Sequence, residues 1–515
     1  MIISKSLFKE YINMPQLARW SKNNKDIYKL INQVRYAGID WATVGQAVED
    51  AVLRSLADKH IASVVTTKRA RWDNRYTNYD AETRQVLAKN PDADVIYQPG
   101  FLYNNMYCKC DLLVKNDSGT YDLREVKAKN TIRKKTKAAP LLDDLIADVS
   151  FQDQVLRGAL GMMYSGNTYI IHLNKKYKKN WDIDLDQLLI REDVSDELMT
   201  KDDIDNKIIS IQSDIPLTKP ELDTKHPYIR QDHLSYFGTM PAKGSIWKLP
   251  RLGAKITSLY QSGKTMISDL DTVDRDNLRN AKWEETGVMR YLDLWNQWET
   301  VIKSEEIKNR LDSLQYPLYF YDYETISVPI PVFEQTHSWQ QVITQYSMHR
   351  MDADGTITHT EWLIDSGQTE NKSLIDQLVS DFGSGEGSYI VWYKWFENSR
   401  NTETGEIYPQ HQEIFNKVNE HTFDLMDIFK EQLYFDRRFG GSCSIKKVLP
   451  VLTDISYSGL VVPNWAIAAD LLAQLAHGTL PADQVDTVRA DLLQYCKQDT
   501  RAMVRIWEVV CKAIG

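Results

Sequence analysis

A strand-like run of apolar and aromatic residues near position 320 ends in two carboxylates. Its sequence, PLYFYDYET, occupies residues 317–325 and carries Asp322 and Glu324 two positions apart. Alternate residues of a strand point to the same face, so we expect both carboxylates to project together. Neighbouring carboxylates repel each other, and a divalent cation relieves that repulsion. The pair is therefore either part of a metal site or two solvated acids at the end of an exposed strand.

Two further acidic residues fall in segments that are otherwise rich in apolar residues. Glu397 comes shortly after an apolar strand-like run, at a position where the start of a helix would also favour an acid. Asp499 lies in a helical stripe of apolar residues within 492–510, and Tyr495 precedes it by four positions on the same face. An unpaired carboxylate on a buried helix face is costly. We therefore expect either a metal ion or a buried arginine beside Asp499.

A second set of candidate residues lies in the segment YCKCDLLVKNDSGTYDLREVKAKN, residues 107–130. Asp111 opens one predicted strand, a turn follows at 116–119, and the next strand carries Glu125 and Lys127 on one face. An acid pair can bind a cation, while a lysine can stabilise negative charge on an attacked phosphate. The pattern Glu-x-Lys also occurs by chance in exposed strands.

The elements that must position these residues alternate between strand-like and helix-like patterns, which predicts an α/β protein. Residues 1–190 begin with helices and continue through strands, a helix near 141–164 and a further strand at 168–174. Residues 191–305 are charged and interrupted by prolines, and we expect a connecting, partly helical region there. Residues 306–515 form the second α/β domain in this interpretation.

The C-terminal stretch resembles the DEDD exonuclease superfamily, an RNase H-like fold with Asp-x-Glu on its first strand. The segments YDYETI, FEQT, GSCSIKKVLP and YCKQDTRAM resemble more closely an uncharacterised bacterial family built on this pattern. The resemblance implies a two-metal 3′–5′ exonuclease in which Tyr495 orients the attacking water, as in the DEDDy subclass, and Asp424 is a supporting residue. Two Mg²⁺ or Mn²⁺ ions would be held by Asp322, Glu324, Glu397 and Asp499. Glu397 stands where the superfamily usually has aspartate.

The N-terminal stretch resembles the PD-(D/E)XK nuclease superfamily, which has a restriction-endonuclease-like fold, and especially its RecB-like branch. The resemblance implies metal ligands at Glu49, Asp111 and Glu125, with Lys127 as a catalytic residue. The predicted helix WATVGQAVEDAVL supplies Glu49, and DVSFQDQVL supplies Gln152 as a supporting residue. Position 156 is leucine, where RecB-like relatives commonly have tyrosine. Many relatives hold an iron–sulfur cluster on four cysteines, and we expect no cluster in this chain.

Composition limits the remaining functions only loosely. The chain has 515 residues, of which 43% are hydrophobic and 26% charged, and its formal net charge is −9. A nucleic-acid scaffold would usually be basic, but a nuclease can be acidic overall because its site holds carboxylates. Five scattered cysteines do not suggest a disulfide framework, and no apolar run is long enough to span a membrane. We expect a cytoplasmic protein without membrane contact.

Two classes of function remain compatible with these observations. The first is a metal-dependent hydrolase that cleaves phosphodiester bonds at one or both sites, with DNA favoured over RNA as the partner. The second is a nucleic-acid-binding or assembly protein in which one or both nuclease sites have degenerated. Basic residues between positions 127 and 137 could grip phosphates near the N-terminal site or could belong to a solvated loop.

Overall fold

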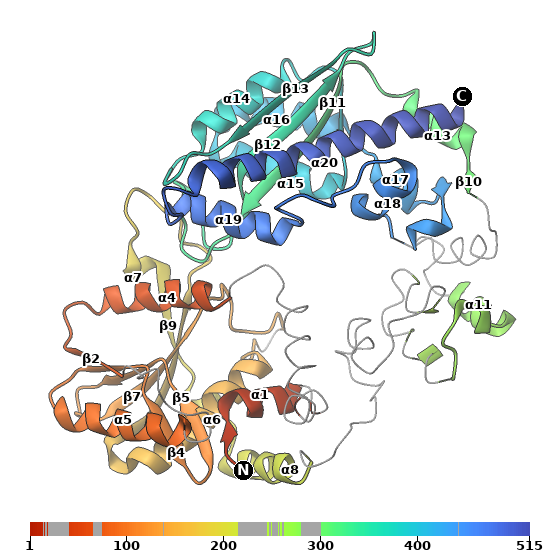
Figure 1. The fold of residues 1–515 in the computed structure, drawn as a ribbon. Coiled ribbons are helices and arrows are strands. Elements are labelled where there is room, and N and C mark those ends of the chain that lie inside the picture. The colour runs from red at the N-terminus through yellow and green to blue at the C-terminus, as the bar shows by residue number, and fades with distance from the viewer. Residues whose placement is uncertain are drawn as a thin grey trace. The chain divides into compact units, whose positions relative to one another are not determined.

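The chain divides into two compact units, which are described separately (Figure 1). The computed structural model describes residues 1–13, 15, 18, 41–64, 75–136, 139–214, 245–246, 249, 256, 258–259, 262–279, 300–440 and 442–515. The N-terminal unit comprises Met1–Tyr228, Pro329–Pro331 and His337–Trp339. The C-terminal unit comprises Ile229–Val328, Val332–Thr336 and Gln340–Gly515. Both units combine helices with mixed sheets, so the chain is an α/β protein.

The N-terminal unit is built around a six-stranded mixed sheet with the order β2-β3-β6-β7-β8-β9. The predicted hairpin is present as β6 and β7, which pair antiparallel across a turn that Gly119 enables with a φ of 80°. Strand β7 also pairs in parallel with β8, which places Glu125 and Lys127 in the interior of the sheet. The strands of this sheet are β2 Ile61–Ser63, β3 Val95–Tyr97, β6 Leu112–Lys115, β7 Tyr121–Lys127, β8 Tyr164–Leu173 and β9 Leu189–Asp193.

Helices and a small second sheet complete the N-terminal unit. Helix α6 (Asp143–Leu160) packs on β8 and on helix α1 (Lys5–Asn13). Helix α8 (Lys201–Asp214), which lies in the stretch expected to be a connecting region, adds Ile204 and Ile211 to the same hydrophobic core. The remaining elements are α4 Trp41–Ser55, α5 Arg75–Lys89, α7 Leu185–Leu188 and the three-stranded sheet β1 Ile3–Ser4, β5 Met106–Lys109 and β4 Gly100–Tyr103.

The C-terminal unit contains a five-stranded mixed sheet with the order β13-β12-β11-β14-β15. The central strand β11 pairs antiparallel with β12 and in parallel with β14. Its residues alternate between two hydrophobic cores, because neighbouring strand residues point to opposite faces. Tyr319, Tyr321 and Tyr323 join one core, and Leu318 and Phe320 join the other. The strands are β11 Leu318–Ile326, β12 Val342–Met351, β13 Ile357–Leu363, β14 Ser388–Val391 and β15 Thr422–Asp424.

The long C-terminal helix α20 (Val485–Ile514) packs against β11, β12 and β13 (Figure 1). Two hydrogen bonds fix it on the sheet: Gln345 Nε2 donates to Leu492 O at 2.8 Å, and the hydroxyls of Ser347 and Thr500 lie 2.8 Å apart. Its residues therefore have a defined register against the sheet. The other helices of this unit are α11 Thr272–Arg279, α13 Ser304–Leu311, α14 Lys372–Phe382, α15 Lys394–Ile407, α16 Gln412–Glu420, α17 Met426–Lys430, α18 Ile445–Leu452 and α19 Trp465–His477.

A small two-stranded sheet pairs β10 (Val301–Ile302) with β16 (Tyr434–Phe435) in the C-terminal unit. Of the helices in the described parts of the chain, none combines the length and the apolar character that crossing a bilayer requires.

Candidate active site

Three carboxylates meet on one side of the C-terminal sheet. Asp322 and Glu324 project from β11 on the face that also carries Leu318 and Phe320, and Asp499 approaches from α20. One carboxylate oxygen from each of the three acids lies within 4.8 Å of the others. The pairing register of β11 with β12 shifts directly after Glu324, an irregularity of the kind that re-aims side chains beside functional sites.

Burial disfavours ionisation of all three acids, and repulsion by a neighbouring acid adds to this effect for Asp322 and Glu324. Burial, followed by the nearby Asp499 carboxylate, raises the pKa of Asp322 to about 8. The same two effects, with Asp322 as the first charged neighbour, hold the pKa of Glu324 well above its ordinary value. Burial also raises the pKa of Asp499 to about 6. A cluster of acids that resists deprotonation in this way favours a bound cation, because the cation would stabilise the charged forms.

Glu397 joins the cluster from the first turn of α15. Its side chain is 2% exposed, and its Oε2 atom has no hydrogen-bond partner among the described residues. Burial, then the neighbouring Asp322, holds the pKa of Glu397 well above its ordinary value. A buried oxygen without a partner is expensive, and a metal ion is one group that would satisfy it.

Tyr495 and two residues that sequence reasoning missed surround Asp499. Tyr495 is buried one turn before Asp499 on α20, and Lys446 of α18 donates a hydrogen bond of 3.1 Å to its hydroxyl. The Lys446 ammonium also lies over the rings of Tyr457 and Tyr495, at 5.0 and 4.9 Å from their centroids. The Tyr457 hydroxyl donates a hydrogen bond to Asp499 Oδ1. Lys446 lies in the segment GSCSIKKVLP noted above, but its spacing gave no sign of a role.

The four acids line a cavity of about 820 Å³. Of the described residues that line it, Lys446 is the one with a positively charged side chain, and its hydrogen bonds go to Tyr495 and to Pro463 O. Aromatic side chains, including Tyr393 and Trp465, form another part of the lining. The cavity therefore combines hard oxygen ligands with flat apolar surfaces.

Asp424, at the end of β15, holds part of the cavity lining in place through backbone hydrogen bonds. Its carboxylate accepts hydrogen bonds from the backbone N–H groups of Tyr393, Lys394 and Met426, at 3.0–3.1 Å. Two of these N–H groups belong to the entry into α15, the helix that carries Glu397. Asp424 therefore fixes the start of α15 and is not one of the three clustered carboxylates.

The predicted residues of the N-terminal unit meet in a cluster of a different kind. Lys127 Nζ lies 2.5 Å from Glu125 Oε1 and 2.9 Å from Asp148 Oδ2. Gln152 is fully buried and donates to both acids, at 2.9 Å to Glu125 and 3.0 Å to Asp148. Lys5 of α1 adds an ion pair of 3.0 Å with Glu125. Each of the two buried acids therefore contacts more than one cationic or amide donor.

These donors reverse the usual effect of burial on the acids. Burial opposes ionisation of Glu125, but Lys127 and Lys5 outweigh it and lower the pKa of that carboxyl. The pKa of Asp148 is likewise held well below its ordinary value, because Lys127, Lys5 and Lys9 outweigh the effect of burial. Sequence reasoning missed Lys5, Lys9 and Asp148. Asp148 could have been found, since it lies one helical turn before Gln152.

Among the described residues, Asp111 and Glu49 form none of the ion pairs that hold Glu125 and Asp148, although Asp111 lies near Glu125. Asp111 Oδ2 accepts a hydrogen bond of 2.7 Å from the backbone N–H of Val126, and burial followed by the nearby Glu125 raises the pKa of Asp111 to about 7. Glu49 Oε2 accepts hydrogen bonds of 2.9 Å from Tyr97 and Gln98. The described acids of this unit form no group of three as close as that of the C-terminal unit.

The cysteines of the N-terminal unit are packing residues in this structure. Cys108 and Cys110 are buried in its hydrophobic core with their sulfur atoms 3.8 Å apart. Burial holds the pKa of the Cys110 thiol well above its ordinary value, so this thiol stays protonated at neutral pH.

One family model matches part of the C-terminal unit. Residues 319–444 match a domain of unknown function, DUF2779. That segment includes Asp322, Glu324 and Glu397 and ends before Tyr495 and Asp499.

Two curated relatives come from mycoplasmas. The chain is 27% identical over 278 residues to "Uncharacterized protein MG366 homolog" of Mycoplasma pneumoniae, covering 49% of this chain and 42% of that protein. It is 24% identical over 275 residues to "Uncharacterized protein MG366" of Mycoplasma genitalium, covering 49% and 41%. The chain thus matches about two fifths of the length of these relatives. A solved structure titled "Crystal structure of SSO0001" aligns with a TM-score of 0.21 and 11% identity, over 41% of this chain and 75% of that one.

Proposed function

We propose that the chain is a metal-dependent nuclease whose C-terminal unit hydrolyses phosphodiester bonds of DNA from the 3′ end. The observation that carries the proposal is the close group of Asp322, Glu324 and Asp499, whose oxygens lie within 4.8 Å of one another. None of these acids forms an ion pair with a described lysine or arginine, although burial disfavours their charged forms. Such a group is suited to binding divalent cations, as in the DEDD pattern that the sequence resembles.

The residues present fit Mg²⁺ or Mn²⁺. Both ions prefer hard oxygen ligands, and the cavity offers carboxylate oxygens from β11 and α20. Glu397 adds a buried oxygen that no described residue satisfies. Bound cations would supply the positive charge that makes a water molecule nucleophilic and that stabilises the leaving 3′ oxygen.

Other residues of the cavity would orient the reactants. Tyr495 keeps its proton, because burial and then the Asp499 carboxylate raise its pKa above the ordinary value, so its hydroxyl can donate to a water or to a phosphate oxygen. Lys446 holds the Tyr495 hydroxyl in place and brings one positive charge to the cavity. Tyr457 holds Asp499 in one orientation through its hydrogen bond.

In the N-terminal unit we propose a PD-(D/E)XK-like site at Glu49, Asp111, Glu125, Lys127 and Gln152. A specific observation favours an alternative for this unit: Glu125 already pairs with Lys5 and Lys127. A cation at Glu125 would have to compete with these ammonium groups. The alternative is therefore a nuclease fold that binds nucleic acid without cutting it.

The test is a gel assay on end-labelled single- and double-stranded DNA and RNA, in Mn²⁺, Mg²⁺ or EDTA. The variants are Asp322→Asn, Glu125→Gln and, as a matched control, Asp381→Asn, which removes an acid that pairs with Tyr346 elsewhere in the C-terminal unit. We expect metal-dependent removal of 3′ nucleotides that falls at least about a hundredfold in Asp322→Asn, since metal contacts contribute several kcal/mol to the transition state. The control should retain full activity.

Two results would contradict the proposal. One is the absence of cleavage of every substrate by the wild-type chain. The other is equal cleavage by wild type and Asp322→Asn, which would place any activity elsewhere. Loss of activity in Glu125→Gln alone would move the catalytic role to the N-terminal unit.

A further inference from the structure

Large exposed aromatic side chains line the carboxylate cavity or lie next to its lining. Tyr393 and Trp465 line the cavity and are 48% and 63% exposed. Trp395, two residues after Tyr393, is 67% exposed, and the two rings lie 6.1 Å apart between centroids. Apolar side chains that gather on a surface often mark a contact for a ligand, and here two tryptophans and a tyrosine lie in or beside one cavity.

The chain holds Tyr393 in an unfavourable backbone conformation. Its φ is 109°, a region that side chains other than glycine rarely occupy. The Asp424 carboxylate stabilises this conformation through the N–H groups of Tyr393 and Lys394, and the Lys394 ammonium donates to Thr422 O at 2.6 Å. Backbone strain that is maintained by buried polar groups is typical of functional positions. Here these hydrogen bonds fix the backbone of Tyr393, and with it the position of its side chain, directly before α15.

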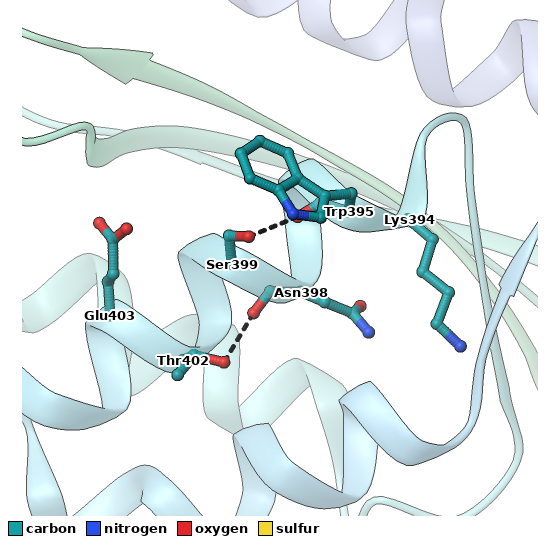
Figure 2. A pocket seen from close by; sticks show the side chains of 6 residues that line it. All are labelled: Lys394, Trp395, Asn398, Ser399, Thr402 and Glu403. Atoms are coloured by element: carbon teal, nitrogen blue, oxygen red, sulfur yellow. Dashed lines mark hydrogen bonds between the residues drawn. The ribbon is translucent and has the colours of Figure 1, made fainter. Parts of the chain in front are cut away.

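A shallow hollow of about 540 Å³ continues from Trp395 along α15. Figure 2 shows the indole of Trp395 at one end, with Asn398, Ser399 and Thr402 following along the same helix. These residues are spaced by three and four positions, so they share one face of α15. Trp395 lines this hollow while Tyr393, two residues earlier, lines the carboxylate cavity. The adjacent rings of Tyr393 and Trp395 therefore connect the hollow along α15 with the carboxylate cavity.

We propose that Tyr393, Trp395 and Trp465 form a stacking surface for the bases of a single-stranded nucleic acid whose end enters the carboxylate cavity. The proposal rests on the proposed function and deepens it, because it names the form of the substrate. Aromatic faces stack on any base, so such a surface tolerates all sequences. In a duplex the base faces are already stacked on one another, and this surface would gain little.

The position of the rings favours nucleic acid over a protein as the occupant. Tyr393 and Trp465 share one cavity with Asp322, Glu324, Glu397 and Asp499, so a ligand that covers the rings also reaches the acids. A nucleotide offers an apolar face to the rings and a phosphate to cations held by the acids. An unmodified protein segment carries no phosphate for those cations.

The test separates binding from hydrolysis. Binding of a fluorescein-labelled 12-nucleotide single strand to the full chain is followed by anisotropy in EDTA, where cleavage is blocked, with DNA and RNA versions and a DNA duplex as the three arms. The variants are Trp395→Ala and Trp465→Ala, with Trp395→Phe to retain a ring. The matched control is Trp362→Ala, an exposed tryptophan on β13 that lines neither hollow.

We expect the single strand to bind more tightly than the duplex, and each alanine variant to weaken its binding about tenfold, as loss of one stacked base does. Trp395→Phe should keep most of the affinity, and Trp362→Ala should equal wild type. Equal binding by the wild type and both alanine variants, or no binding at all, overturns the inference. If the alanine variants lose affinity for the DNA and the RNA strand equally, stacking is the contact that both share. If they lose affinity for one of the two alone, that nucleic acid is the substrate.

A parallel hydrolysis assay in Mn²⁺ distinguishes this inference from the proposed function. Tryptophan-dependent binding without any hydrolysis supports the stacking surface and overturns the nuclease. Hydrolysis with the same kcat/KM in wild type, Trp395→Ala and Trp465→Ala supports the nuclease and overturns the stacking surface. Hydrolysis with a raised KM and an almost unchanged kcat in the alanine variants supports both.

Discussion

The two units each bury a group of acids on a mixed sheet, but they compensate the negative charge differently. In the N-terminal unit, Glu125 and Asp148 contact three ammonium groups at distances between 2.5 and 3.3 Å. In the C-terminal unit, none of the four clustered acids forms an ion pair with a described residue. The nearby Lys446 donates to Tyr495 and to a backbone carbonyl instead. Similar residues therefore make a network of ion pairs in one unit. In the other they make a group of acids in which Lys446 lowers the pKa values too little to offset burial.

A structural acid and a candidate metal ligand differ in the direction in which the fold shifts the pKa of the carboxyl. A buried acid with lysine partners has a lowered pKa and contributes to folding through its ion pairs, as Glu125 does. A buried acid surrounded by other acids has a raised pKa and weakens the folded state at neutral pH, as Asp322 does. The second arrangement is tolerated at functional sites, where a ligand supplies the missing charge.

The same glutamate-to-glutamine substitution should have opposite effects on the stability of the two units. Glu125→Gln leaves Lys5 and Lys127 with one partner fewer in a buried network, so we expect the free energy of unfolding of the N-terminal unit to fall by about 3 kcal/mol. Glu324→Gln removes an acid whose ionisation the fold opposes. We therefore expect it to raise the free energy of unfolding of the C-terminal unit by about 1 kcal/mol in EDTA at pH 8. Urea unfolding followed by hydrogen exchange reports each unit.

Opposite signs are the essential result of that experiment. If both substitutions destabilise their units by similar amounts, the C-terminal acids have partners that compensate their charge, and the contrast between the units is wrong. Asp381→Asn serves as the control for replacing an ion-forming side chain elsewhere in the C-terminal unit.

The stability of the two units should also depend differently on pH. Burial and then Asp499 raise the pKa of Asp322 to about 8, and burial raises the pKa of Asp499 to about 6. A raised carboxyl pKa means that the folded state keeps a proton that the unfolded state loses above about pH 4. In EDTA the C-terminal unit should therefore lose stability as the pH rises from 5 to 8, by up to about 1.4 kcal/mol per pH unit for each such proton.

The N-terminal unit should have a shallower slope over the same range. The pKa of Glu125 and that of Asp148 are lowered by their lysine partners, so their contribution is fully present above about pH 4 and is lost only below it. Asp111 is the exception, because burial and then Glu125 raise its pKa to about 7. Its single proton should make the N-terminal unit lose some stability as the pH rises toward 7. Thermal unfolding at four pH values, with and without Mn²⁺, measures both slopes. A slope in the N-terminal unit as steep as that in the C-terminal unit would contradict the account.

The smallest effect that we predict concerns a residue beside the acids. Tyr457→Phe removes the hydroxyl that orients Asp499, and we expect Mn²⁺ affinity to fall about tenfold, as for other residues that orient metal ligands. The matched control is Tyr346→Phe, which removes a tyrosine–aspartate hydrogen bond of 2.6 Å to Asp381 in the same unit. Mn²⁺ titrations of the two variants should differ. Equal affinities would show that Tyr457 does not position a ligand.

Local patterns predict part of the C-terminal site. The alternation along β11 places Asp322 and Glu324 on one face, and the apolar stripe of α20 places Tyr495 and Asp499 on another surface that must be buried. The hairpin of β6 and β7 is predicted by its turn residues in the same way. In each case the residues are only a few positions apart, so the periodicity of a strand or a helix is enough to predict how they are placed.

The partners of these acids could not be predicted, because they are distant along the chain. Lys446 and Tyr457 lie 49 and 42 positions from the residues that they contact, and Lys5 lies 120 positions from Glu125. Such contacts depend on how helices pack on a sheet, which no local pattern encodes. The charge balance of each cluster, which distinguishes the two units, is therefore visible only in the folded chain.

The most direct test of the account is calorimetric titration of the full chain with Mn²⁺ at pH 7, in two buffers with different enthalpies of protonation. Asp322, with its pKa raised to about 8 by burial and Asp499, must release a proton to bind a cation, so the apparent heat should depend on the buffer. We predict Mn²⁺ binding with proton release in the wild type and in Asp111→Asn, and its loss in Asp322→Asn. Absence of Mn²⁺ binding to the wild type, or binding that survives Asp322→Asn and disappears in Asp111→Asn, would contradict the central claim that the uncompensated acids of the C-terminal unit form the metal site.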